Sequence, residues 1–144
     1  LAGVFLVGSE PIPAGYGAPS QVVPMVLNDA GVIGLSLNGK SFPATLPVMA
    51  KVNETVEIHY YNEGLQIHPM HLHGIPQTII ARDGFPLANP ERADTVNVAP
   101  GQRVTVLVKA RPDQTGVWAF HCHILNHAEK DDGMFGMVTT FIVS

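Results

Sequence analysis

Short runs rich in valine, isoleucine, threonine and aromatic residues recur along the sequence, and no stretch carries a helical period of convincing length. Turn signals separate these runs, at Asn38-Gly39, Glu63-Gly64, Asp83-Gly84 and Pro100-Gly101. The pattern predicts an all-β fold: a Greek-key β-sandwich of about eight antiparallel strands in a single domain. The predicted strands are VVPMVLND, GVIGLSLNG, TVEIHYYNEG, PQTIIARDG, DTVNVAPG, RVTVLVKARPD, GVWAFHCHI and GMVTTFIVS.

Charge and hydrophobicity exclude several classes of partner. Hydrophobic residues make up 46% of the 144 residues and charged residues 14%, which is typical of a compact globular chain. The formal net charge is −4 and the basic residues are scattered, so we expect no nucleic-acid partner. No apolar run approaches the roughly 20 residues that cross a bilayer, so we expect no membrane span.

The first 25 residues differ from the rest of the chain. The opening LAGVFLVG is apolar but has no basic residue and no initiator methionine, so we interpret it as a first strand, or otherwise as the remainder of a signal or linker. Four prolines follow between Ser9 and Pro24. We therefore predict an N-terminal arm or first strand with a Pro/Gly-rich linker over residues 1–25, and the β-sandwich over residues 26–144.

Six of the seven histidines fall in two short segments, His68-Pro-Met-His-Leu-His73 and His121-Cys-His-Ile-Leu-Asn-His127. Successive side chains of a strand point to opposite faces. If both segments are strands, His68 and Cys122 can point into the sandwich, and His127 can curl back towards Cys122 from beyond the strand end. The remaining four histidines can gather on the outside; they are His71, His73, His121 and His123.

This parity predicts two metal environments. The inner one combines a thiolate, two imidazoles and a nearby thioether, which is the ligand set of a type 1 copper site: Cys122, His68 and His127 with Met134 as axial ligand. The outer one offers four imidazoles, which suit copper and zinc alike. A lone cysteine is more often an inert buried residue, and a single His-x-His pair is more often surface decoration. Two such pairs interleaved with the inner ligands favour the metal interpretation.

Other features have simpler interpretations. His59 alternates with Ile58 and Tyr60, and we expect it to be an exposed strand residue rather than a ligand. Asn126 precedes a predicted ligand, and a supporting hydrogen bond and a plain turn role are equally open. The chain lacks His-Glu-x-x-His, Cys-x-x-Cys, a Gly-rich phosphate loop and Gly-x-Ser-x-Gly, so the chemistries of those motifs are not indicated.

The motifs HPMHLHG (68–74) and HCHILNHAEKDDGM (121–134), with Asp94-Thr95-Val96 before Val98-Ala99-Pro100-Gly101, resemble the C-terminal cupredoxin domain of multicopper oxidases of the laccase type. The resemblance covers the chain from about Asn28 onward. It implies type 1 copper on His68, Cys122 and His127. It also implies that His71, His73, His121 and His123 form half of a trinuclear, oxygen-reducing cluster of type 2 and type 3 copper, with His-Cys-His carrying electrons between the two sites.

The chain departs from the family pattern at two points. The family commonly places the axial methionine five residues after the last ligand histidine, where this chain has Asp132; Met134 follows two residues later, and Met137 is a rival. In addition, the two other His-x-His motifs of the family are absent from this sequence. The chain therefore cannot complete the cluster by itself, and whether it is an enzyme depends on other domains or chains.

Three functions stay open at this point. The first is one-electron transfer through a type 1 copper towards the outer histidines, with oxygen reduction if a partner cupredoxin domain completes the second site. The alternatives are a stand-alone blue-copper electron carrier and a copper binding or storage protein. The expected partners are an electron donor that approaches an exposed edge of His127 (a small reductant or a redox protein), dioxygen, and a partner domain or homo-oligomer. We expect a secreted protein in a periplasmic or extracellular location.

Overall fold

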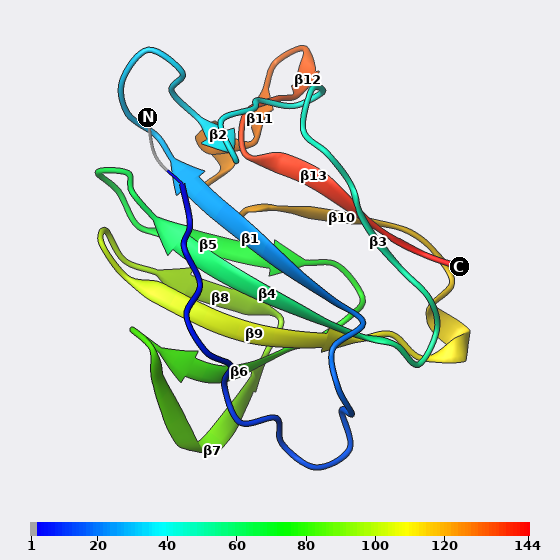
Figure 1. The fold of residues 1–144 in the computed structure, drawn as a ribbon. Helices are drawn as coiled ribbons and strands as arrows, with labels where there is room; N and C mark the ends of the chain where they lie inside the picture. The colour runs from blue at the N-terminus through cyan, green and yellow to red at the C-terminus, as the bar shows by residue number, and fades with distance from the viewer. Residues whose placement is uncertain (1–2) are drawn as a thin grey trace.

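A computed structural model describes residues 3–144, which fold as a sandwich of two β-sheets (Figure 1). One sheet has six strands, in the order β2 (Ser36–Leu37), β1 (Gln21–Asn28), β4 (Thr55–Asn62), β9 (Arg103–Lys109), β6 (Gln77–Arg82) and β7 (Phe85–Ala93). The other has five, in the order β3 (Val48–Ala50), β13 (Val138–Val143), β10 (Gly116–Cys122), β5 (His68–Leu72) and β8 (Thr95–Val98). This architecture confirms the predicted all-β sandwich.

Two strand pairs depart from the predicted antiparallel pattern. The strand β1 pairs with β4 in parallel, and β3 pairs with β13 in parallel. Both exceptions lie towards the same side of the sandwich, where the chain crosses from one sheet to the other between β2 and β4 (Figure 1). A crossover of this kind brings a strand back beside its neighbour in the same direction, which a tight hairpin cannot do.

The core consists of inward-facing residues from both sheets. Val56, Ile58 and Tyr60 of β4 are buried, and so are the three valines that stand at every second position of β9. Residues two apart in a strand point to the same face, which here is the core. The Tyr60 ring meets Phe120 of the opposite sheet edge-on, with ring centroids 6.3 Å apart. Met70, Leu72 and Cys122 belong to the same buried cluster. The sulfur-bearing residue of the predicted inner site is therefore part of the hydrophobic core.

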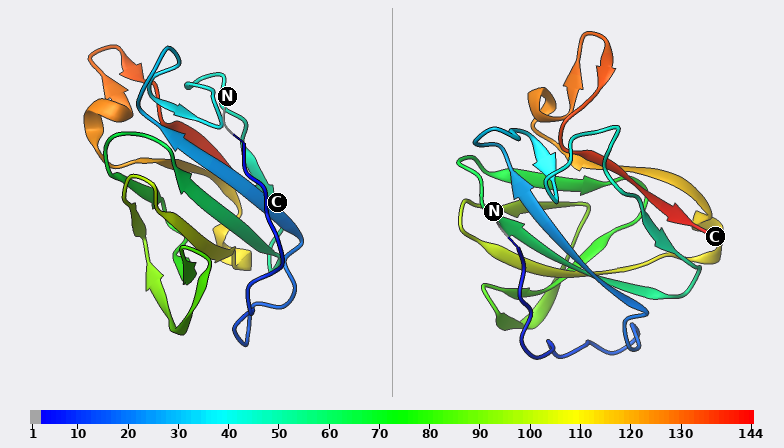
Figure 2. Two further views of the ribbon diagram at one scale, coloured as in Figure 1. Left: turned by 60° about the vertical axis from the view of Figure 1, so that its left-hand side comes forward. Right: turned by 45° about the horizontal axis from the view of Figure 1, so that its top comes forward.

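Sequence patterns missed several elements. The strand β7 is almost wholly exposed and contains two prolines, so it has no apolar alternation to recognise (Figure 1). The three-residue β3 and the small hairpin of β11 (Glu129–Lys130) and β12 (Gly133–Met134) are too short for a periodic signal. Figure 2 shows this hairpin projecting from one end of the sandwich. Two 3₁₀ turns, Pro112–Gln114 and Leu125–His127, complete the described elements.

The N-terminal residues do not match the preferred interpretation. Residues 3–20 contain no strand, so the apolar opening does not form one over the residues described; residues 1 and 2 lie outside them. These residues run as an arm along the sandwich before β1 begins at Gln21 (Figure 2). The strand β1 thus begins inside the range 1–25 that we assigned to the arm.

Candidate metal centres

The parity prediction is confirmed by the burial of the two histidine segments. Along β5 the side chains alternate between buried and half-buried, with His68, Met70 and Leu72 buried. At the end of β10, Phe120 and Cys122 are buried while His121 is half-buried. The two strands are hydrogen-bonded neighbours, and their registers place Cys122 opposite Met70 and His121 opposite His71. One pair of adjacent strands therefore builds both an inward and an outward cluster.

The inner cluster consists of Cys122, His68 and His127. The Cys122 Sγ atom lies 3.7 Å from Nδ1 of His68 and 3.7 Å from Nδ1 of His127. One ligand atom from each of the three residues lies within 4.8 Å of the others, and all three residues are buried. Imidazole nitrogen and thiolate sulfur bind first-row metals at about 2.0 to 2.3 Å, so ligand atoms 3.7 Å apart can share one ion. One thiolate sulfur and two imidazole nitrogens suit copper, which binds both soft sulfur ligands and imidazole.

Burial keeps these side chains uncharged in the absence of metal. It raises the pKa of the Cys122 thiol to about 11 and lowers the pKa of both His68 and His127. At neutral pH the inner cluster thus consists of one thiol and two neutral imidazoles. A neutral imidazole has a free nitrogen lone pair, which is what binds a metal. A thiol can donate to one imidazole at a time, and a metal ion would take the place of its proton.

Position along the chain explains how His127 reaches the group. It ends the 3₁₀ turn Leu125–His127, which follows β10 and turns the chain back over Cys122. Its backbone carbonyl accepts a hydrogen bond from Met137, and the Met137 carbonyl accepts one from Cys122. Only 2% of His127 is exposed. The expectation that an electron donor approaches an exposed edge of His127 is therefore wrong for this structure, because the residue is buried.

The structure separates the two candidate methionines. Met134 lies in the β11–β12 hairpin with 57% of its surface exposed, whereas Met137 is fully buried and belongs to the same core cluster as Cys122. The hairpin takes up the extra residues of the loop after His127 and carries Met134 outward. The axial role of Met134 stays a prediction, and its rival Met137 is the buried methionine of the two.

The outer cluster brings together all four predicted histidines. The His71 ring centroid lies 4.7 Å from that of His73, 5.7 Å from that of His121 and 5.4 Å from that of His123. The Nε2 atoms of His73 and His121 are 3.0 Å apart. Burial and the neighbouring imidazoles lower the pKa of His73 and His121. The strand register thus yields a compact set of imidazoles on the face opposite to the core.

Backbone and hydroxyl contacts orient two of these rings. The Nδ1 atom of His71 lies 3.0 Å from Thr95 Oγ1 and 3.1 Å from the Asp94 carbonyl. The Nδ1 atom of His121 lies 2.9 Å from the carbonyl oxygen of Cys122. Since a carbonyl only accepts, both contacts favour the Nδ1–H tautomer and leave Nε2 free as a ligand atom. The second contact also links the outer cluster directly to Cys122.

Sequence reasoning missed the supports of these histidines. Gly74, which ends the HPMHLHG motif, has φ +67°, and a Cβ at this position would overlap the Trp118 ring. The Trp118 indole donates to the Gln114 carbonyl, and the Gln114 side chain donates to the Gly74 carbonyl. A glycine after a His-x-His pair was the available signal for this close packing.

Two other residues take ordinary roles. His59 is not fully exposed as expected: its ring contacts Glu57 and Thr105 on the outer face of the six-stranded sheet, under the N-terminal arm. It contacts neither histidine cluster. The side chain of Asn126 is exposed and makes no hydrogen bond to residues 3–144, which fits a turn residue.

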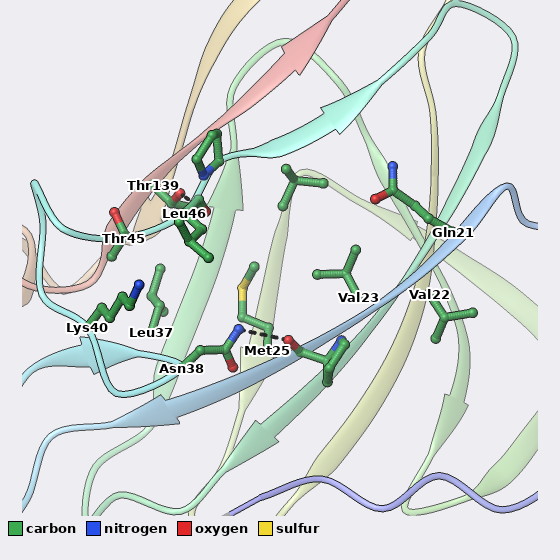
Figure 3. A pocket seen from close by; sticks show the side chains of 13 residues that line it. Gln21, Val22, Val23, Met25, Leu37, Asn38, Lys40, Thr45, Leu46 and Thr139 are labelled. Atoms are coloured by element: carbon green, nitrogen blue, oxygen red, sulfur yellow. Dashed lines mark hydrogen bonds between the residues drawn. The ribbon is translucent and has the colours of Figure 1, made fainter.

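Two cavities lie away from both clusters. A groove of about 320 Å³ opens between β1 and β3, where the side chains of Val23, Met25 and Leu46 face one another and Asn38 donates to the Pro24 carbonyl (Figure 3). It contains no histidine, cysteine or carboxylate. The second, of about 620 Å³, lies between the N-terminal arm and the six-stranded sheet beside His59. Neither cavity brings together a set of metal ligands.

The sequence profile described as "Multicopper oxidase" matches residues 18–144, which include both histidine clusters. The chain belongs to the multicopper oxidase family. Copper resistance protein A of Escherichia coli is 37% identical over 100 residues, covering 69% of this chain and 15% of that protein. The laccase of Haloferax volcanii is 35% identical over 133 residues, covering 85% of this chain and 23% of that protein.

Solved multicopper oxidases share the fold. The blue copper oxidase of Nitrosomonas europaea superimposes with a TM-score of 0.80 at 27% identity, over 92% of this chain and 46% of that one. The chain is thus a multicopper-oxidase-type cupredoxin domain, and copper is its cofactor. It spans about a quarter or less of the length of these two sequence relatives. Among residues 3–144, no helix is long and apolar enough to cross a membrane.

Proposed function

We propose that this domain transfers single electrons between a type 1 copper held by Cys122, His68 and His127 and a second copper site on the four outer histidines. The observation that carries the proposal is the equal 3.7 Å separation of Cys122 Sγ from Nδ1 of both inner histidines in a fully buried group. Copper held by one thiolate and two imidazoles supplies one-electron oxidation and reduction.

The protein itself contributes three things to this chemistry. The sandwich core keeps water away from Cys122 and holds the two inner imidazoles in place before metal arrives. The peptide bonds of His121-Cys122-His123 give the shortest covalent connection from the inner thiol to the outer cluster. The contact between His121 Nδ1 and the Cys122 carbonyl supplies a second connection over 2.9 Å.

For the axial position we propose Met137. A weak axial thioether must reach a buried site from within the core, and Met137 is the buried methionine of the segment that follows His127. Its backbone contacts both Cys122 and His127. Met134, which we had expected in this role, would need the β11–β12 hairpin to fold inward over the site.

The outer site is half of what oxygen reduction requires. His71, His73, His121 and His123 supply four imidazoles, and the chain has no further His-x-His motif. We therefore propose that dioxygen is reduced only where a partner cupredoxin domain or chain adds the missing histidines. A location outside the cytoplasm, in the periplasm or the extracellular space, and the division at residue 25 remain part of this proposal.

The decisive experiment measures copper per chain together with the optical and electron paramagnetic resonance spectra of wild type and three variants. Cys122→Ser should abolish the intense thiolate-to-copper band, and His71→Ala should retain that band while losing the second copper. His59→Ala, a histidine outside both clusters, is the matched control and should change neither. Retention of the band in Cys122→Ser would sink the proposal, and bleaching of His71→Ala would refute the separation into inner and outer sites.

A further inference from the structure

Two buried polar side-chain atoms near the inner cluster have no hydrogen-bond partner among the described residues. They are Oδ2 of Asp29 and Nε2 of His68. The Asp29 and His68 side chains are 1% and 0% exposed, and Asp29 Oδ1 lies 4.0 Å from His68 Nε2. Leaving a buried polar group unsatisfied costs about 1 to 3 kcal/mol, more if it is charged, so such a pair needs an explanation.

A hydrogen bond and a glycine in the neighbouring loop hold the Asp29 carboxylate at this position. Asp29 follows the end of β1, and its Oδ1 accepts a 2.6 Å hydrogen bond from the Leu65 backbone N–H. A Cβ at Gly64 would overlap that same oxygen, so the loop needs glycine at 64 to admit the carboxylate. The loop from Glu63 to Ile67 leads directly into His68 at the start of β5.

The buried Asn62 fixes this loop from the other side. Its side-chain oxygen accepts from the Gly64 N–H, and its side-chain nitrogen donates to the carbonyls of Gln66 and Val98, each over 2.8 Å. The segment that carries Asp29's hydrogen-bond donor is therefore anchored to β4 and β8. Its position relative to His68 is a property of the fold rather than of a mobile loop.

The need for an acceptor follows from the orientation of the His68 ring. Nδ1 of His68 points at Cys122 Sγ, so Nδ1 must be unprotonated to bind a metal there. A neutral imidazole with a free Nδ1 carries its proton on Nε2, which then has to donate to something. In the described part of the chain, the Asp29 carboxylate is the group that faces this atom.

We infer that Asp29 is a positioning residue whose carboxylate accepts the Nε2–H of His68 and so keeps the Nδ1 lone pair aimed at the copper ligand position. A hydrogen bond requires the 4.0 Å between the Asp29 carboxylate oxygen and His68 Nε2 to close by about 1 Å. Supporting contacts of this kind fix the tautomer and ring orientation of metal-binding histidines. The inference rests on the proposed function, because it assigns a partner to one of the proposed ligands.

The test compares three substitutions of Asp29 with an exposed carboxylate as control. Asp29→Asn keeps an acceptor oxygen but removes the charge. Asp29→Ala and Asp29→Leu both remove the acceptor, and Leu also keeps the side-chain volume. If one of these two variants fails to fold, the other still provides the test. Asp131→Asn, on the β11–β12 hairpin, is the matched control. The readouts are the affinity for cuprous ion by competition with a chelator, and the His68 tautomer in the metal-free protein by nitrogen-15 NMR.

We expect the acceptor-free variants to lose about tenfold to 100-fold in copper affinity and to lose the pure Nε2–H tautomer. Asp29→Asn should keep the tautomer and lose less affinity, and Asp131→Asn should match wild type. A purely structural role predicts lower thermal stability of the metal-free protein with an unchanged tautomer, and that result would overturn the inference. So would wild-type affinity in Asp29→Ala or Asp29→Leu.

The thiolate-to-copper band separates this inference from the proposed function. If wild type and the Asp29 variants all show the band with equal affinity, Asp29 has no positioning role but the type 1 site stands. If wild type with copper shows no band that depends on Cys122, the proposed function fails and the inference fails with it.

Discussion

At the scale of single residues, burial separates the two methionines that follow His127. Met137 is fully buried and Met134 is 57% exposed. We predict that Met137→Leu raises the reduction potential of the type 1 site, because the potential depends on the axial ligand. The exchange conserves volume, so the free energy of unfolding should fall by less than about 1.5 kcal/mol. Spectroelectrochemical titration measures the potential.

Met134→Leu is the matched control for that experiment and should leave the potential unchanged. The reverse result, with Met134→Leu shifting the potential and Met137→Leu neutral, would mean that the hairpin closes over the site when copper binds. It would restore the ligand that spacing within the sequence first suggested.

Gly74 illustrates how one backbone position supports the outer histidines. We predict that Gly74→Ala destabilises the fold by more than the roughly 1 to 2 kcal/mol of a left-handed alanine, because the new methyl group also overlaps the Trp118 ring. Gly84→Ala is the matched control, with φ +81° and no atom within 4 Å of the new Cβ. Chemical denaturation of both variants measures the difference. Equal losses would show that Trp118 moves aside freely.

At the scale of elements, strand pairing sets the site more than any single side chain does. The register of β5 against β10 places Cys122 opposite Met70 and His121 opposite His71. A shift by one residue would exchange the inward and outward sets, because side chains alternate with a period of two. Both the inner and the outer cluster therefore depend on one strand register.

A buried polar network holds β5 at this register from the opposite sheet. Gln77 of β6 donates to the Met70 carbonyl of β5, and the Tyr60 hydroxyl of β4 donates to the Gln77 side-chain oxygen. We predict that Gln77→Leu lowers the free energy of unfolding by about 1 to 3 kcal/mol for each group left unpaired, more than Tyr60→Phe does. Denaturant titrations of both variants provide the comparison. Equal stability of Gln77→Leu and wild type would contradict this role.

The burial of Tyr60 leads us to predict that the fold becomes less stable at alkaline pH. Burial raises the pKa of Tyr60 well above its usual value near 10, because the phenolate is disfavoured in the core. The folded state thus holds this proton more tightly than the unfolded state. The contribution of protonated Tyr60 to the free energy of unfolding is complete below about pH 10 and is lost as pH rises beyond that. Tyr60→Phe should flatten this alkaline decline in thermal melts, and an unchanged slope would argue against it.

At the scale of the whole molecule, the four outer histidines gather on one face of the sandwich. We predict that the monomeric chain, loaded with copper, accepts electrons from a one-electron donor but sustains no oxygen consumption. Adding a cupredoxin domain that carries two His-x-His motifs should give sustained oxygen consumption. Native mass spectrometry with an oxygen electrode measures both points. Steady oxygen reduction by the monomer would show that four histidines suffice.

The sequence by itself determined the fold class and the division of the histidines. Alternation in short strands predicts a sandwich, and parity within HPMHLH and HCHILNH turns His68 and Cys122 inward and four histidines outward, because side-chain direction in a strand is a local property. It also predicted β1, β2, β4, β6, β8, β9, β10 and β13 from their apolar content. Spacing alone left Met137 open as a rival to Met134, because a two-residue insertion can be absorbed in many loop conformations.

Only the tertiary structure decided which methionine is buried, that His127 is buried, and that Asp29 lies beside His68. Asp29 and His68 are 39 positions apart, and nothing in the local pattern of either predicts their meeting. The exposed β7 and the short β3 were likewise recognisable only by their partners in the sheets. Local geometry fixes the direction in which a side chain points, whereas its contacts depend on which distant segments the fold brings beside it.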